Sequence, residues 1–286
     1  MDTLRSALQP LTTNLPTPIR NLGISLIGET CYQTLLLDID LTNQACLKLA
    51  VSKGLGIAII AASSIVKIPQ ILKLLSSKSA SGISFLSYLL ETSAYLIGLA
   101  YNVRQGFPFS TFGETGLIMA QNVVIAVLVL NYSGKATGGA VFVAGLAAAA
   151  YALFSPNVVD MPTLGYFQAG AGVLGVASKL PQILAVWREG GTGQLSAFAV
   201  FNYLLGSLSR IFTTLQEVDD KLILYGFVAG FILNAVLAAQ MAYYWNAPEK
   251  KSVKGSGKAK VALPASTAGS STATPKGKSP TTRRRG

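Results

Sequence analysis

Two charged side chains interrupt long apolar stretches of the sequence and are its clearest candidates for polar chemistry. Glu91 stands in YLLETSAYL, and Arg210 stands in LGSLSRIF. An ionisable residue inside a membrane-spanning helix is costly and marks a functional site by default. A Glu91–Arg210 pair would neutralise both charges. It would act either as a structural ion pair or with Arg210 contacting a phosphate, which the planar guanidinium fork suits.

The residue inventory excludes the common catalytic machinery. The chain has no histidine and only 2 cysteines, which rules out a Ser-His-Asp triad, an HExxH zinc site and a four-cysteine zinc site. We therefore expect no catalytic residue of these kinds, no metal and no cofactor.

Uncharged polar side chains inside the apolar stretches suit a sugar ligand, because hydroxyl groups need amide donors and acceptors. These candidates are Gln121, Asn122, Asn202, Asn234 and Gln216. Glu114 opens its apolar stretch, where we expect its carboxylate to end in water. Three tyrosines could stack on a sugar ring, although helix packing or a place at the membrane interface is the better interpretation of each: Tyr95, Tyr101 and Tyr203.

A motif of the form K-φ-P-Q-I-L occurs twice, in residues 66–72 and 178–184, with an offset of 112 residues. A proline inside a helix removes one backbone hydrogen bond and kinks the helix, and in lipid the freed carbonyl needs a partner. The neighbouring glutamine can supply that partner or line a polar cavity. Two ordinary helix ends are the alternative, but the matched copies favour a pair of hinges at Pro69, Gln70, Pro181 and Gln182.

The elements that carry these residues are predicted to be membrane-spanning helices. The chain has 286 residues, 51% hydrophobic and only 12% charged, about half the charge of an ordinary soluble domain. A soluble all-α core would show a polar stripe on each helix, which these segments lack. Each of seven apolar runs is near the roughly 20 residues that a helix needs to cross a bilayer: 51–72, 83–103, 112–132, 138–154, 164–186, 195–215 and 222–245.

The repeated motif divides the chain into two copies of three spans joined by one more. Copies arranged in this way begin on the same side of the membrane, so they form a parallel repeat about an axis along the membrane normal. We expect an all-α polytopic membrane protein with these parts: an N-terminal lumenal or interfacial segment 1–48, a first repeat 49–132, a linker helix 133–160, a second repeat 161–247 and a disordered basic tail 248–286.

The charge distribution predicts the orientation. The net charge is +11, and ten basic residues against one acidic residue follow Asn246, so the tail carries +9. A segment so rich in Lys and Arg is expected to be cytoplasmic, which puts the N-terminus on the other side. We interpret the tail as a solvated segment that determines the topology. Binding of anionic lipid is a weaker interpretation, and binding of nucleic acid is the weakest.

The two cysteines, Cys31 and Cys46, fall on the predicted lumenal side. An oxidising lumen permits a disulfide between them, although two free thiols fit the sequence equally well.

The chain resembles the PQ-loop membrane proteins, which include SWEET-type sugar transporters and the lysosomal cystine carrier. Within that group it is most similar to the mannose-P-dolichol utilization defect family of the endoplasmic reticulum. The similarity covers roughly residues 30–247 and is carried by these stretches: CLKLAVSKGLG (46–56), VKIPQILKLLSSKSASGIS (66–84), FPFSTFGE (107–114), GGTGQLSAF (190–198), GSLSRIFTTLQE (206–217) and AAQMAYYWNA (238–247).

The resemblance implies a non-enzymatic protein of the endoplasmic reticulum membrane. Such a protein is needed for the use of mannose-P-dolichol and glucose-P-dolichol in lipid-linked oligosaccharide, N-glycan and GPI-anchor assembly, and its partners are the lipid-linked sugar, the bilayer and lumenal glycosyltransferases.

Three alternatives stay open: a small-solute transporter, a glycosyltransferase and a scaffold that moves nothing. Every Asp after Asp2 lies in a predicted loop or in the N-terminal segment, which counts against proton coupling, although Glu91 remains. The absence of histidine and of a DxD motif in a suitable place counts against the glycosyltransferase.

Overall fold

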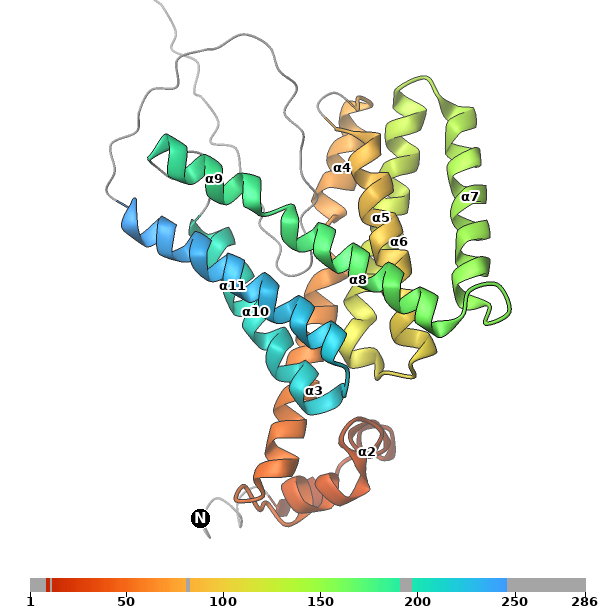
Figure 1. The fold of residues 1–286 in the computed structure, drawn as a ribbon. Coiled ribbons are helices and arrows are strands. Elements are labelled where there is room, and N and C mark those ends of the chain that lie inside the picture. The colour runs from red at the N-terminus through yellow and green to blue at the C-terminus, as the bar shows by residue number, and fades with distance from the viewer. Residues whose placement is uncertain (1–8, 11, 81–82, 191–196, 246–286) are drawn as a thin grey trace, which may run out of the picture.

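A computed structural model describes residues 9–10, 12–80, 83–190 and 197–245 (Figure 1), and every regular element in this part of the chain is a helix. The predicted tail from residue 248 onward lies outside the described residues. In chain order the elements are α2 (Thr17–Tyr32), the π-helix η1 (Gln33–Leu37), α3 (Gln44–Ser63), α4 (Ile68–Ser77), α5 (Phe85–Arg104), α6 (Phe109–Tyr132), α7 (Ala136–Phe154), α8 (Met161–Ala177), α9 (Leu180–Glu189), α10 (Ala197–Glu217) and α11 (Lys221–Tyr243).

The helices correspond to the seven expected spans, with α3–α4 and α8–α9 each forming one interrupted span. Within the described residues, five segments are long and apolar enough to cross a membrane: 44–77, 109–132, 136–154, 161–188 and 221–243. The other two expected spans are α5 and α10, with 20 and 21 residues. Both have spanning length, and their polar side chains lower their hydropathy.

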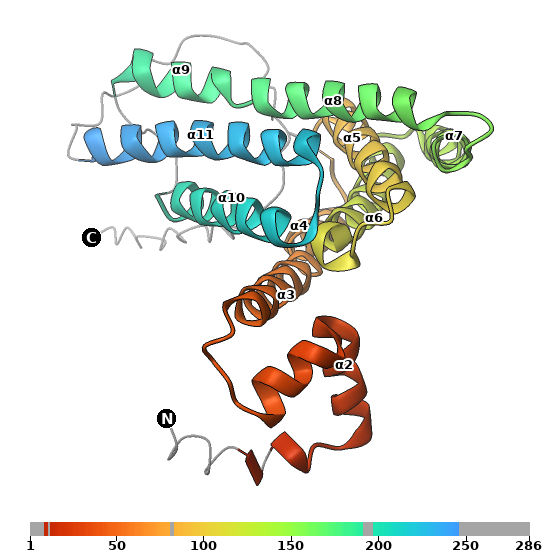
Figure 2. The ribbon, with the colours of Figure 1, turned by 60° about the horizontal axis from the view of Figure 1, so that its bottom comes forward.

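The two repeats pack in matching ways. In the first repeat (α3–α6), α3 and α4 contact α6, and α6 contacts α5. In the second repeat (α8–α11), α8 and α9 contact α11, and α11 contacts α10. The contacts between repeats are reciprocal, because α5 packs on α8 while α10 packs on α3. Figure 2 shows the second repeat with α8–α9, α11 and α10 running side by side, α11 in the middle.

The proline of each motif lies in the first turn of a new helix, so each span is broken just before it. At the first break, hydrogen bonds from Val66 N–H to Ser63 O and from Ile68 N–H to Ile65 O form a tightened turn. The side chain of Gln121 braces this turn from α6. Its Nε2 donates to Ser63 O at 2.8 Å, and its Oε1 accepts from Lys67 N–H at 2.9 Å.

The partner of the freed backbone is therefore not the glutamine beside the proline. Gln70 interacts with the Tyr88 hydroxyl instead, and Gln182 is exposed. At the offset of the repeat, the counterpart of Gln121 is Leu233, which has no amide. The two breaks therefore occur at matching positions but are held differently.

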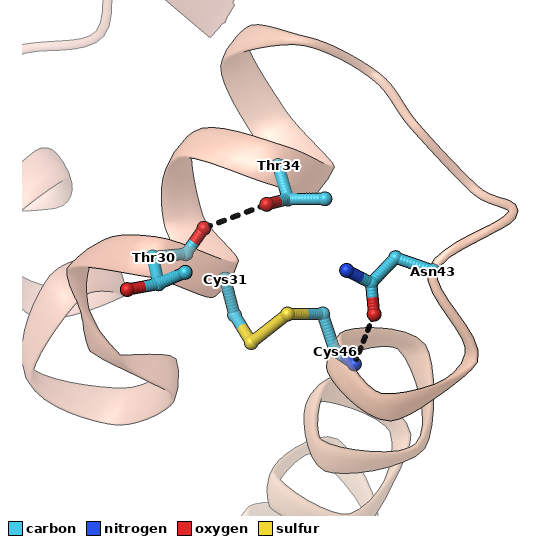
Figure 3. Close-up of a disulfide and its surroundings, with 5 residues drawn as sticks. All are labelled: Thr30, Cys31, Thr34, Asn43 and Cys46. Carbon is cyan, nitrogen blue, oxygen red and sulfur yellow. Dashed lines mark hydrogen bonds between the residues drawn. A yellow bond between two sulfur atoms is a disulfide. The ribbon is translucent and has the colours of Figure 1, made fainter.

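The N-terminal segment is joined covalently to the first span. Cys31 at the end of α2 and Cys46 in the first turn of α3 form a disulfide (Figure 3). The Asn43 side chain caps α3 by accepting from Cys46 N–H at 3.1 Å, a common helix N-cap. The helix α3 thus begins within the segment that we expected to precede the first repeat, and α2 packs beside it.

Many large apolar side chains point outward, as a surface in contact with lipid requires. On α8, Leu164 is the buried residue, whereas Tyr166, Val173 and Leu174 are each more than two-thirds exposed. A soluble protein rarely exposes such contiguous apolar area. Three buried apolar clusters lie in the described part of the chain: between α4, α5, α6 and α7, between α5, α7, α8 and the start of α11, and between α9, α10 and α11.

Candidate functional site

A cavity of about 570 Å³ lies between the two repeats. Residues of α5 and α6 line it from the first repeat, and residues of α8, α10 and α11 line it from the second, together with Lys179 at the α8–α9 break. Its volume is within the range of small-molecule sites, and a mostly apolar wall with a few converging polar groups is typical of such sites.

Arg210 and Glu114 form an ion pair in the wall of this cavity. The Arg210 side chain is only 2% exposed, and its Nη1 also donates to the backbone oxygen of Ser110 at 3.2 Å. The Arg210 Nε has no hydrogen-bond partner. Two expectations are wrong here: Arg210 does not pair with Glu91, and the Glu114 carboxylate is buried instead of ending in water.

Glu91 forms its contacts inside the first repeat and does not line the cavity. Its Oε1 accepts from the Tyr95 hydroxyl at 3.0 Å and lies 3.5 Å from Lys67 Nζ. The reason that Glu91 and Arg210 do not meet is the packing of their helices. Each packs on the first span of the other repeat, α5 on α8 and α10 on α3.

A second polar group in the cavity surrounds Lys179. Its Nζ donates to Asn234 Oδ1 at 2.5 Å and lies 5.6 Å from the centre of the Tyr203 ring. Asn234 Nδ2 in turn donates to Ser207 Oγ at 3.1 Å and to Tyr203 O at 3.0 Å. No carboxylate of the described residues pairs with Lys179.

Two more amides reach the cavity. The Oε1 of Gln168 on α8 is buried without a hydrogen-bond partner, and Asn102 on α5 donates to Gly98 O at 2.7 Å. The Gln168 oxygen is free to accept from a ligand hydroxyl, because no protein group uses it.

A third polar cluster joins α3, α6 and α10 beside the cavity. The Glu217 carboxylate accepts from Ser52 Oγ at 2.5 Å, Lys53 Nζ at 2.6 Å and Ser110 Oγ at 2.6 Å. The Ser110 backbone oxygen accepts from Arg210, so this cluster continues into the cavity wall. The two charged side chains of α10, Arg210 and Glu217, are thus both neutralised by residues of the first repeat.

The structure brings only two of the seven predicted pathway residues, Arg210 and Asn234, into the cavity. Gln121 braces the first helix break, and Asn122 is fully buried with both amide atoms lacking partners. The four motif residues, and Glu91, Asn202 and Gln216, do not line the cavity.

Sequence reasoning missed Lys179, Gln168, Asn102 and Ser207 in the cavity, and Lys53 and Glu217 beside it. Alignment of the two repeats at the 112-residue offset would have pointed to Lys179. In that alignment Tyr203 takes the position of Glu91, so the second repeat has no carboxylate there for its lysine. No grouping of three or more His, Cys, Asp or Glu side chains suited to a metal occurs within the described part of the chain.

Comparisons with known proteins agree with this architecture. A family model described as the PQ loop repeat matches residues 51–111 and 164–223. Human solute carrier family 66 member 3 is 28% identical over 180 residues, which cover 62% of this chain and 86% of the relative. No solved structure matches the chain. The chain is therefore an all-α polytopic membrane protein, and two of its segments are similar to the PQ loop repeat.

Proposed function

We propose that this protein with two PQ-loop repeats binds dolichol-phosphate-linked mannose or glucose in the cavity between the repeats. It flips the lipid-linked sugar or presents it for lipid-linked oligosaccharide, N-glycan and GPI-anchor assembly, and it catalyses no reaction. The observation that carries the proposal is the cavity itself, which combines two basic side chains, an amide oxygen without a protein partner and a mostly apolar wall.

The charge of the cavity supports an anionic ligand. Its charged lining residues are Glu114, Lys179 and Arg210, which give a net charge of +1. A dolichol-phosphate sugar has one phosphodiester group with a single negative charge, so its binding would neutralise the site. A buried charge needs a partner because leaving it unpaired in a medium of low dielectric is costly.

The remaining lining suits a sugar attached to a lipid. Gln168, Asn102 and Tyr95 supply polar groups for sugar hydroxyls. Along α8 and α11, a Cβ atom added at Gly172, Gly175 or Gly230 would meet nothing within 4 Å. These small residues leave an apolar space that could accommodate the first isoprene units.

The proposal places the protein in the endoplasmic reticulum membrane, with its N-terminus in the lumen and its C-terminus in the cytoplasm. The Cys31–Cys46 disulfide near the N-terminus supports this orientation, because disulfides persist in an oxidising lumen. The Lys- and Arg-rich C-terminal segment supports it from the other end of the chain. Lumenal glycosyltransferases would receive the bound sugar.

The proposal is tested by reconstituting the purified protein in vesicles and measuring transbilayer movement and binding of a labelled mannose-P-dolichol analogue, with free mannose as the comparison. We expect binding of the lipid-linked sugar and no uptake of the free hexose. Hexose uptake without lipid binding would overturn the proposal.

A matched pair of variants tests whether the cavity is the site. Gly230→Leu should fill the cavity without a backbone collision and abolish binding of the analogue. Gly145→Leu adds the same side chain to the exposed face of α7, where a Cβ also meets nothing within 4 Å. It should leave binding unchanged. Equal binding by both variants would place the ligand elsewhere.

A small-solute transporter is the second candidate, and the name of the human relative, solute carrier family 66 member 3, favours it. The same vesicle assay distinguishes the two, because a solute carrier would move a water-soluble sugar or amino acid. If the protein moves and binds neither class, the scaffold for lumenal glycosyltransferases becomes the better explanation.

A further inference from the structure

The two repeats place a lysine at the same point of the fold but give it different partners. Lys67 and Lys179 are separated by the 112-residue offset, and each directly precedes a helix whose first turn contains the Pro-Gln pair. Each ammonium also lies over a tyrosine ring, at 5.5 Å from the centre of Tyr88 and 5.6 Å from the centre of Tyr203. The surroundings of the two lysines are therefore closely comparable.

The difference is the counter-charge. Lys67 Nζ lies 3.5 Å from the Glu91 carboxylate. At the offset of the repeat, the counterpart of Glu91 is Tyr203, so the second repeat has no carboxylate there. Lys179 instead donates to the neutral amide oxygen of Asn234. The first repeat gives its lysine a carboxylate partner, whereas no carboxylate of the described residues pairs with the lysine of the second repeat.

That charge is directed at the cavity. Lys179 and Asn234 line it, whereas Lys67 and Glu91 do not. The other cation in the wall, Arg210, already has the Glu114 carboxylate as its partner. The net +1 of the cavity therefore comes from Lys179. An amide dipole and an aromatic face reduce the cost of this charge, but they do not cancel it.

We infer that Lys179 is the residue that selects an anionic ligand, and that the anionic group of the ligand takes the place on Lys179 that Glu91 takes on Lys67. This inference rests on the proposed function for the location of the ligand. The ligand class is then a phosphodiester headgroup with one negative charge. Arg210, which is already paired with Glu114, acts as a positioning residue.

The sharpest test is Asn234→Asp, which replaces the amide nitrogen by an oxygen. Lys179 then has a carboxylate as its partner in place of the amide oxygen at 2.5 Å. The variant keeps the size of the side chain and removes the net positive charge, but it also loses the two hydrogen bonds that Asn234 Nδ2 donates to Ser207 Oγ and Tyr203 O. Lys179→Gln removes the charge and leaves those two bonds in place. Because a hydrogen bond to a charged group is among the stronger ones, we expect the affinity for a labelled mannose-P-dolichol analogue to fall by at least about tenfold.

Two controls separate this effect from damage to the fold or from distant charge. Asn202→Asp introduces the same negative charge on α10 outside the cavity, and its affinity should stay within about twofold of the wild type. Lys179→Gln should lose affinity as Asn234→Asp does, whereas Lys67→Gln should not. Loss of monodisperse elution in detergent identifies variants that have failed to fold.

The probes are the mannose-P-dolichol analogue and a neutral mannosyl isoprenol of the same chain length. The wild type should prefer the anionic probe, and Asn234→Asp should lose that preference. If Asn234→Asp and Lys179→Gln bind the anionic probe like the wild type, the inference fails while the proposed function stands. If the wild type binds neither probe, both fail together.

Discussion

Removal of the Glu114 carboxylate is the perturbation whose cost the structure predicts most directly. The Arg210 guanidinium is 2% exposed, the Glu114 side chain is 5% exposed, and the two form an ion pair. Glu114→Gln keeps the shape of the side chain but leaves the guanidinium buried without a counter-charge. Breaking a buried pair from one side costs about 3–5 kcal/mol. Because the amide oxygen can still accept from Arg210, we expect about 3 kcal/mol.

The assay is the free energy of unfolding in mixed micelles titrated with sodium dodecyl sulfate. Glu29→Gln is the matched control, because Glu29 on α2 is exposed, and it should change stability by less than about 0.5 kcal/mol. The double variant Glu114→Leu/Arg210→Met removes both charges. Replacing both charges by apolar groups is often close to neutral, so this variant should be more stable than Glu114→Gln.

The reasoning would be refuted by a Glu114→Gln variant as stable as the Glu29→Gln control. It would also be refuted by a double variant that loses at least as much stability as the single one. Either result would mean that Glu114 does not compensate Arg210.

Three further predictions concern the framework around the cavity. Gln121→Leu, which copies Leu233 of the second repeat, removes both side-chain bonds to the first helix break and should cost about 1–3 kcal/mol of unfolding free energy; an unchanged value in the same titration would contradict the brace. Cys31 and Cys46 should resist thiol alkylation until the protein is reduced. Replacing both by serine should cost about 3 kcal/mol, given the 15-residue separation. Gly56→Ala places a Cβ 2.6 Å from the Ser110 backbone oxygen, whereas Gly54→Ala meets nothing within 4 Å. Only the first should lower stability, by about 1–3 kcal/mol, and equal effects in thermal unfolding would contradict the close helix approach.

The sequence predicted the helices and their breaks well because these depend on local properties. Apolar runs of spanning length define each helix, and a proline that cannot donate a hydrogen bond defines each break. The repeated motif also identified the two copies, because the same local pattern appears at a fixed offset.

The contacts between polar residues could not be predicted in the same way. Glu91 and Arg210 were paired because they lie in equivalent spans, but the rotation of a helix about its axis and its choice of neighbour are not local properties. Glu114 was placed in water by counting residues from the helix start. In the structure α10 covers that end of α6 and buries Glu114 against Arg210.

Gln121 is another residue whose contacts could not be predicted from the sequence. Its amide was predicted to meet a sugar, and the glutamine beside the proline was expected either to satisfy the broken backbone or to line a polar cavity. The structure uses Gln121 for the backbone, because α6 packs directly on the α3–α4 break and holds its side chain at the exposed backbone groups. A partner supplied by another helix leaves no trace in the spacing of the motif.

The ion pairs between the repeats are concentrated on one side of the molecule. Lys53–Glu217 and Glu114–Arg210 both join α10 to the first repeat, whereas no ion pair of the described residues joins α5 to α8. Near the C-terminal end of α5, the Tyr101 hydroxyl donates a hydrogen bond to Asp220. The contacts between α5 and α8 are mainly apolar. In a bilayer, apolar contacts between helices can be exchanged for contacts with lipid tails at little cost, while a buried ion pair cannot. Separation of the repeats is therefore cheaper along α5–α8 than along α3–α10. Because α8 also forms the glycine-rich wall of the cavity, the cavity lies next to the contact between the repeats that costs least to separate.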